Sequence, residues 1–146
     1  IVRSQYDDNG NVIEKRHLDS NRKLTKRICI YKYVYDEQGR KIEERRYDDS
    51  ENLISTSAGF KSSITRYAYD DQGREIERSF YNQNGNLIDG EAKIVYDYSK
   101  EPELKETPSF LKDALHKEGA GWVEQVYYDK KGNEIRRSFQ FMSNKN

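Results

Sequence analysis

The sequence has 146 residues, which suits one domain, but only 34% of them are hydrophobic and the mean hydropathy is −1.16. Its 26 basic residues balance 26 acidic ones and Tyr occurs 12 times, which excludes the charged, aromatic-poor composition of disordered chains and predicts a thin core. Balanced charge favours neither nucleic acid nor an anionic membrane as partner, and no apolar run approaches the roughly 20 residues of a membrane span.

A Tyr-Asp-x-x-Gly unit recurs along the chain, at 6–10, 35–39, 69–73 and 128–132. Asp at the first position of a turn can accept hydrogen bonds from the backbone two residues on, and Gly three positions later adopts the left-handed conformation. Apolar and aromatic flanks turn such a loop into a β-hairpin with a glycine bulge. The predicted structural turn residues are Asp7, Gly10, Asp36, Gly39, Asp70, Gly73, Asp129 and Gly132.

The units follow one another at a nearly constant distance. The tyrosine anchors are Tyr6, Tyr35, Tyr69, Tyr98 and Tyr128, at steps of 29, 34, 29 and 30 residues. A second, weaker turn follows the first three anchors, at 18–21, 47–54 and 81–88. This periodicity predicts a single mainly β domain over 1–146, an antiparallel β-hairpin repeat array that forms a meander sheet, either curled or solenoid-like.

Alternation within the expected strands places the tyrosines on one face. In 28–35 a period of two puts Cys29 on the same side as three tyrosines, and 64–69 and 92–98 repeat the pattern. These rings form either the core or an exposed platform that stacks on sugars or on a partner protein. The candidate binding residues are Tyr31, Tyr33, Tyr67, Tyr69, Tyr96 and Tyr98.

The fourth unit lacks its glycine turn and continues into an insertion at 99–121. Thr107 suits a helix N-cap, Pro108 the first helical position and Gly119 the C-terminal cap. The pattern predicts one short helix, which either covers a sheet face or binds a partner.

Catalytic and metal-binding patterns are weak. His17 and His116 have no metal-ligand spacing, and the sequence holds no nucleophile elbow, P-loop or dinucleotide fingerprint. The single cysteine, Cys29, excludes an intrachain disulfide and a cysteine-based metal cluster. The acidic turn at 7–11 lacks the full spacing of a calcium loop. We therefore expect no enzyme activity, no catalytic residue, no metal and no cofactor.

The Tyr-Asp-x-x-Gly-(Asn/Arg) units resemble bacterial YD-repeats of the rearrangement-hotspot type and, more loosely, the hairpin repeats of MORN-like antitoxins. The resemblance covers most of 1–98 and 122–142. YD-repeat proteins are typically exported or cell-surface β-rich proteins, and some enclose a toxic cargo, for which this chain is too short. The resemblance implies a bacterial, extracytoplasmic (periplasmic, secreted or cell-surface) binding or structural module.

These observations predict a non-enzymatic repeat module that binds a protein or glycan partner through a sheet face or edge. One alternative is an antitoxin- or immunity-like protein that binds a toxin; another is a glycan-binding domain or a carboxylate-based glycan enzyme. The sequence opens at Ile1 within a repeat, without Met or a signal peptide. We therefore expect a processed fragment, with further repeats upstream or self-association through the sheet edges.

Overall fold

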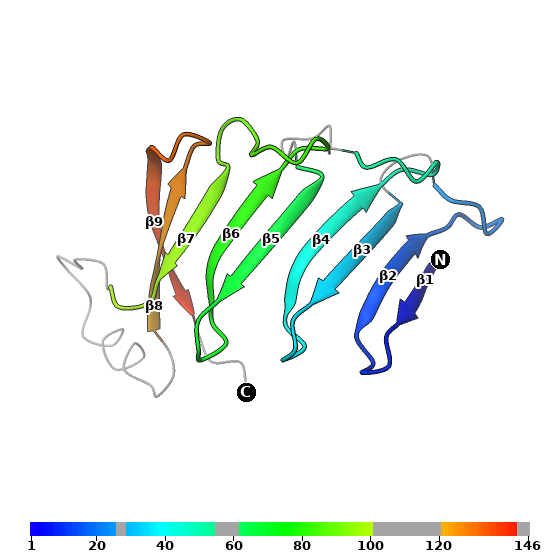
Figure 1. Ribbon diagram of the computed structural model, residues 1–146, viewed down its shortest axis with the longest axis horizontal. Helices are drawn as coiled ribbons and strands as arrows, with labels where there is room; N and C mark the ends of the chain where they lie inside the picture. Colours follow the sequence, from blue (N-terminus) through cyan, green and yellow to red (C-terminus); the bar gives the residue numbers. More distant parts are fainter. Residues whose placement is uncertain (26–28, 55–61, 101–120, 143–146) are drawn as a thin grey trace.

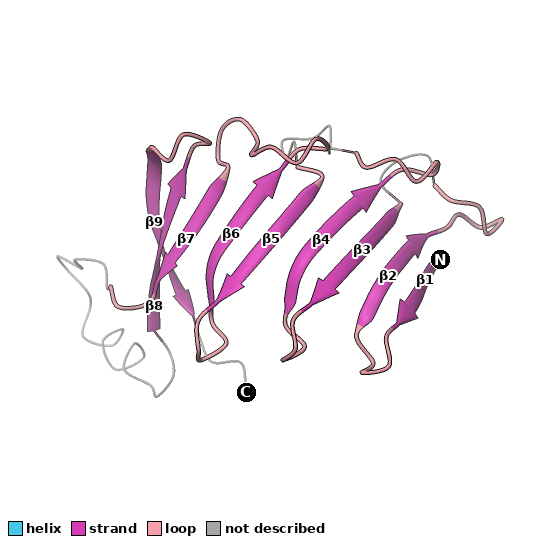
Figure 2. Ribbon diagram, viewed as in Figure 1, coloured by secondary structure: helices cyan, strands magenta, loops and turns pink. Residues whose placement is uncertain are grey.

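A computed structural model describes residues 1–25, 29–54, 62–100 and 121–142, and these residues form nine strands of one sheet (Figures 1 and 2). The strands are β1 (Val2–Tyr6), β2 (Val12–His17), β3 (Ile30–Tyr35), β4 (Lys41–Tyr47), β5 (Ile64–Tyr69), β6 (Glu75–Tyr81), β7 (Lys93–Asp97), β8 (Gly121–Tyr128) and β9 (Glu134–Met142).

Each strand pairs antiparallel with the next along the chain, from β1 to β9, in an open meander (Figure 1). The sequence-based prediction of a mainly β, antiparallel hairpin meander is confirmed. The sheet twists along its length, and β1 and β9 form its two outer edges. The helix predicted within 99–121 falls on residues 107–119, which lie outside the described residues.

The turns lie at the two opposite ends of the strands, which are different edges of the sheet from its outer strands β1 and β9. Three Tyr-Asp turns join β1 to β2, β3 to β4 and β5 to β6 on one edge, which we call the turn edge (bottom in Figure 1). The Asp129 turn joins β8 to β9 on the other, the loop edge, because the insertion occupies the β7–β8 connection. Tyr128 therefore lies at the opposite edge from Tyr6, Tyr35 and Tyr69, although its sequence motif is the same.

One hydrogen-bond pattern closes every Tyr-Asp turn. In the turn at 36–39, Asp36 Oδ1 accepts from the amides of Gln38 at 3.0 Å and Arg40 at 2.8 Å, and the Gly39 amide donates to the Asp36 carbonyl at 3.0 Å. Gly39 is left-handed, with φ of 76°. The same bonds recur at Asp7, Asp70 and Asp129. The pair register shifts by one residue beside each turn, as in a glycine bulge.

The second set of turns, on the loop edge, uses the same geometry with less suitable residues. Asp19, Asp48 and Asn82 each accept amide hydrogen bonds from residues two and four positions on. The left-handed position is Gly85 in one turn but Arg22 and Glu51 in the others, with φ of 61° and 60°. The turns at Asp19 and Asp48 looked weaker in the sequence because they lack glycine where the backbone is left-handed.

The loop edge also buries a small residue just before each of three strands. Cys29, Ser63 and Ala92 are each 0% exposed, and their amides donate to the carbonyls of Tyr47, Tyr81 and Tyr128. Around Ala92 lies an apolar core cluster of Phe80, Ile88, Ala92, Ile94 and Tyr127. The core therefore sits toward the loop edge and the β6–β8 part of the sheet.

Replacing Gly73 with Ala should destabilise the protein by about 1–2 kcal/mol, because its φ of 78° is costly for a residue with a Cβ. No heavy atom lies within 4 Å of the added Cβ, so no steric clash adds to the backbone strain. Urea unfolding followed by circular dichroism measures it.

The matched control is Arg22, which holds the left-handed position of another turn and where a suitable substitution should raise the free energy of unfolding instead of lowering it. Arg22→Asn should gain up to about 1 kcal/mol, since Asn tolerates the left-handed region, whereas Arg22→Ala should gain nothing. A neutral Gly73→Ala would contradict this account of the turn.

Candidate binding surface

All six candidate tyrosines lie on one face of the sheet, which we call the tyrosine face. Tyr33 pairs with Glu44, Glu44 pairs with Thr65, and Tyr67 lies two residues beyond Thr65 on the same side. Arg78 connects this row to β7, because it pairs with both Tyr67 and Ile94. The tyrosines stand in pairs on β3, β5 and at β7, and every one is half-buried, neither a sealed core nor a bare platform.

Tyrosine hydroxyls fasten each hairpin to the one before it. The hydroxyl of Tyr35 donates to the Val12 carbonyl at 2.9 Å, that of Tyr69 to the Lys41 carbonyl at 2.7 Å, and that of Tyr98 to the Glu75 carbonyl at 2.7 Å. Each carbonyl belongs to the residue five positions after the turn Asp of the preceding hairpin. We call these contacts the tyrosine links; two of the six candidate residues, Tyr69 and Tyr98, therefore have a structural role.

Cations cover much of the tyrosine face. The guanidinium carbon of Arg40 lies 5.1 Å from the ring centre of Tyr69, while Arg40 Nε donates to its own turn Asp36 at 2.7 Å. Arg74 repeats this contact over Tyr98 at 4.6 Å. Farther along the strands, Lys41 Nζ lies 5.3 Å from the ring of Tyr33 and 4.8 Å from that of Tyr67. Rings covered in this way are stabilised by their cations and have less free surface for a partner.

Glutamates join neighbouring hairpins on the opposite face. Glu43 accepts from Arg45 within its own strand at 2.6 Å and from Arg66 of the next hairpin at 2.8 Å. Burial acts to raise the pKa of Glu43, but the hydrogen bonds from the two arginines lower it overall. Glu14 and Glu77 hold the same place, seven residues after a turn Asp, and each forms an ion pair with a lysine of the next hairpin. The constant spacing of seven residues between the turn Asp and this glutamate is visible in the sequence.

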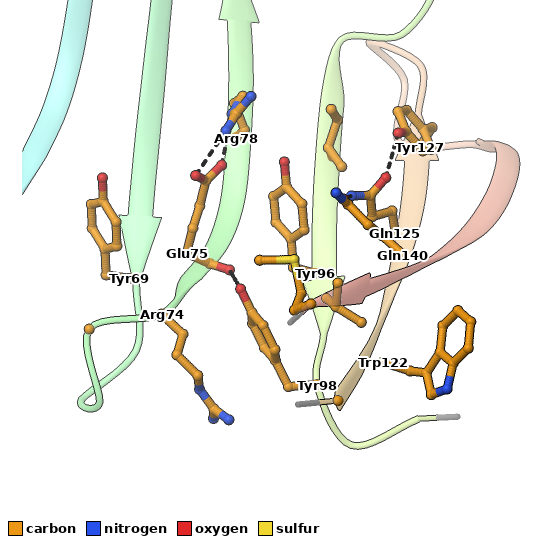
Figure 3. A pocket seen from close by; sticks show the side chains of 15 residues that line it. Tyr69, Arg74, Glu75, Arg78, Tyr96, Tyr98, Trp122, Gln125, Tyr127 and Gln140 are labelled. Carbon is orange, nitrogen blue, oxygen red and sulfur yellow. Dashed lines mark hydrogen bonds and ion pairs between the residues drawn. The ribbon is translucent and has the colours of Figure 1, made fainter. Parts of the chain in front are cut away.

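An open hollow of about 840 Å³ lies on the tyrosine face between β5 and β9 (Figure 3). Apolar and aromatic side chains form its floor: Ile94, Tyr96, Val123 and Tyr127. Three of the six candidate tyrosines, Tyr69, Tyr96 and Tyr98, line it, whereas Tyr31, Tyr33 and Tyr67 do not. The β8 residues were missed because this strand follows the insertion and shows no regular repeat spacing.

Paired polar groups border the hollow on two sides. Arg78 donates to both carboxylate oxygens of Glu75, at 2.8 and 2.9 Å, on β6. Across the hollow, Gln125 donates to Gln140 at 2.7 Å and accepts from the hydroxyl of Tyr127 at 2.8 Å (Figure 3). An aromatic floor with fixed donors and acceptors at its margin can stack on a flat apolar surface and hydrogen-bond its polar edge.

Trp122 borders the hollow without adding its ring to the floor. Side chains alternate along β8, so Trp122 and Gln125 lie on opposite faces. The Trp122 ring packs edge-on against Phe141, with ring centres 5.2 Å apart.

Burial perturbs the ionisable groups of the hollow. It raises the pKa of Tyr96 to about 12. Burial acts to lower the pKa of Arg78, but the hydrogen bonds and charge of Glu75 raise it overall. Arg78 therefore stays cationic, and Tyr96 keeps its hydroxyl proton, at neutral pH.

Other potential sites are poor in the described part of the chain. Within 1–25, 29–54, 62–100 and 121–142, no three His, Cys, Asp or Glu side chains are grouped to hold a metal ion. No helix formed by those residues is long and apolar enough to cross a membrane. His17 packs edge-on against Tyr31, His116 falls outside the described residues, and burial raises the pKa of the Cys29 thiol.

Comparison with known proteins adds no relative: no protein-family model matches the chain, and no curated protein matches it.

The half-buried tyrosines should make the fold sensitive to alkali. Burial raises the pKa of Tyr33 and Tyr96 to about 12, from an ordinary value of 10.0. The folded protein then keeps a proton that the unfolded chain loses. This contribution to stability is complete below pH 10 and is lost as the pH rises toward 12.

The free energy of unfolding in urea, measured at intervals from about pH 9 to about pH 11.5, should fall with pH. In Tyr96→Phe the fall should be shallower, because one of the tyrosines whose pKa burial raises is gone; Tyr33, Tyr35, Tyr69 and Tyr98 remain. An unchanged slope in Tyr96→Phe would show that other groups cause the alkaline instability.

Proposed function

We propose that this chain is a non-enzymatic binding module that holds a partner in the hollow on its tyrosine face. The observation that supports the proposal is that the ring of Tyr96, in the hollow, has no cation over it. Among the described residues, no lysine or arginine lies over the ring of Tyr96, whereas Tyr33, Tyr67, Tyr69 and Tyr98 each have at least one. Tyr127, the other ring of the floor, is covered by Arg136 at 3.4 Å, and Tyr31, which also has no cation over it among the described residues, lies outside the hollow. An uncovered ring in a concave surface can contact a partner without displacing a cation.

The polar groups of the hollow favour a glycan over an apolar protein surface as the partner. Sugar rings present apolar C–H faces for stacking and a border of hydroxyls, which amide and guanidinium groups such as those of Gln125 and Arg78 can hydrogen-bond. Hydrolysis of the glycan is not part of the proposal. Glu75 is the one carboxylate among the described residues that line the hollow, and a glycosidase needs two.

The cellular setting of this module is also a proposal. The Tyr-Asp-x-x-Gly units resemble repeats of bacterial exported and cell-surface proteins, where contact with glycans is frequent. That resemblance is the support for an extracytoplasmic, bacterial role.

The test is titration of the 146-residue chain with a set of neutral and uronic acid-containing oligosaccharides, followed by backbone amide NMR. Shifts should concentrate at Tyr96, Gln125 and Tyr127, and Gln125→Ala should weaken binding by roughly tenfold, the effect of one lost hydrogen bond to a ligand. The control, Tyr33→Phe, lies on the same face outside the hollow and should bind like the parent. Shifts located elsewhere, or equal binding by Gln125→Ala, would contradict the proposal.

A further inference from the structure

The outer strand β1 carries the same groups with which β3 and β5, the first strands of later hairpins, contact the hairpin before them. Three features join a hairpin to the one before it. The first is a short antiparallel ladder; at the β2–β3 junction it pairs Glu14 with Lys32 and Arg16 with Ile30. The second is the tyrosine link, and the third is a cation three residues before the anchor tyrosine, which meets the glutamate of the preceding hairpin.

These features repeat at the next junction with the same register. Arg66 lies three residues before Tyr69, pairs with Glu43 across the ladder and binds its carboxylate at 2.8 Å. The hydroxyl of Tyr69 meanwhile donates to the carbonyl of Lys41. At the third junction Val95 takes the place of the cation, and Lys93 binds Glu77 instead.

In β1 the equivalent residues are Arg3 and Tyr6, again three positions apart. Tyr6 is 61% exposed and Arg3 is exposed too. Among the described residues, neither the Tyr6 hydroxyl nor the Arg3 guanidinium has a partner, and the far side of β1 pairs with no strand. We call this set of groups the β1 edge.

We propose that the β1 edge binds a further hairpin of the Tyr-Asp-x-x-Gly class by antiparallel strand addition. The incoming hairpin must have a free second strand that carries Glu seven residues after its turn Asp. That glutamate pairs with Arg3, as Glu14 pairs with Lys32, and the carbonyl five residues after the Asp accepts from Tyr6. The inference concerns an edge of the sheet and is independent of the hollow.

The same geometry disfavours strands β2, β4, β6 and β9 of a second folded copy as the occupant, and pairing of β1 with the β1 of a second copy is an outcome of the test below. In such a copy, strands β2, β4 and β6 are each paired on both sides. With the tyrosine faces of the two copies on the same side, its outer strand β9 would run parallel to β1, and it carries Arg136 seven residues after Asp129, which would oppose the charge of Arg3.

The sequence offers a direct construction of the complex. Ile1 holds the position of Ile30, five residues before its anchor tyrosine, so a copy of residues 1–29 placed directly before Ile1 recreates the Cys29–Ile30 junction. The probe is this extended chain, compared with the 146-residue chain. Hydrogen exchange by NMR reports whether the second strand of the added copy becomes protected.

The added strand should be protected, and Tyr6→Phe or Arg3→Ala in the original β1 should each reduce its protection by roughly two- to tenfold, as loss of one hydrogen bond implies. Both substitutions should leave exchange in β3–β9 unchanged in the 146-residue chain. An unprotected copy, protection that ignores both substitutions, or a dimer of the 146-residue chain joined through β1 in sedimentation and exchange measurements would each overturn the proposal.

Discussion

The hydroxyls of three anchor tyrosines, Tyr35, Tyr69 and Tyr98, hold this sheet together along its turn edge. A chain with 34% hydrophobic residues cannot bury a thick core, and the apolar core cluster of the described residues lies near β6–β8, toward the loop edge. The turn edge of the earlier hairpins depends instead on directional polar contacts. Each tyrosine link satisfies a backbone carbonyl beside the register shift of the preceding hairpin and holds an aromatic ring half-buried at the same time.

The turn and the link act together through the residue after the glycine. Where that residue is arginine, as at Arg40 and Arg74, it binds its own turn Asp and covers the ring of the next tyrosine. Asn11 and Asn133 bind only the turn Asp. The side-chain bond from Asn11 holds the pKa of Asp7 below its ordinary value. The repeat thus tolerates either residue, but arginine adds a contact between hairpins.

The candidate site lies where this repeat is interrupted. Tyr98 makes the last link, the insertion follows it in the sequence, and the next described strand of the sheet is β8. Lys41, five residues after its turn Asp, lies over the ring of Tyr67, two residues before the next anchor tyrosine. The equivalent residue of the third hairpin is Glu75, and Tyr96 is left without a cation at the floor of the hollow. Functional surfaces are expected where a regular pattern is broken, because regular positions are already committed to packing.

The sequence predicted the strands, the shared face of the tyrosines and the geometry of the Tyr-Asp turns, because all three follow from local periodicity. It missed the hollow, which depends on β8 and β9 and on the twist of the sheet rather than on spacing. It also placed Tyr128 with the other anchors, since a motif does not reveal which edge it occupies once an insertion shifts the strand count. The two alternatives for the tyrosines, a buried core or an exposed platform, leave out the half-buried state that the structure has. A ring whose hydroxyl donates to the carbonyl of a neighbouring hairpin, as in Tyr69, is held half-buried.

The most direct test of the tyrosine links is urea unfolding of Tyr35→Phe, Tyr69→Phe and Tyr98→Phe beside Tyr6→Phe. Phenylalanine keeps the ring and removes only the hydroxyl, and Tyr6 has the same sequence context without an acceptor among the described residues. Each linked variant should lose about 1 kcal/mol of unfolding free energy, while Tyr6→Phe should lose none. Equal losses in all four, or no loss in the three linked variants, would contradict the claim that these hydroxyls join the hairpins.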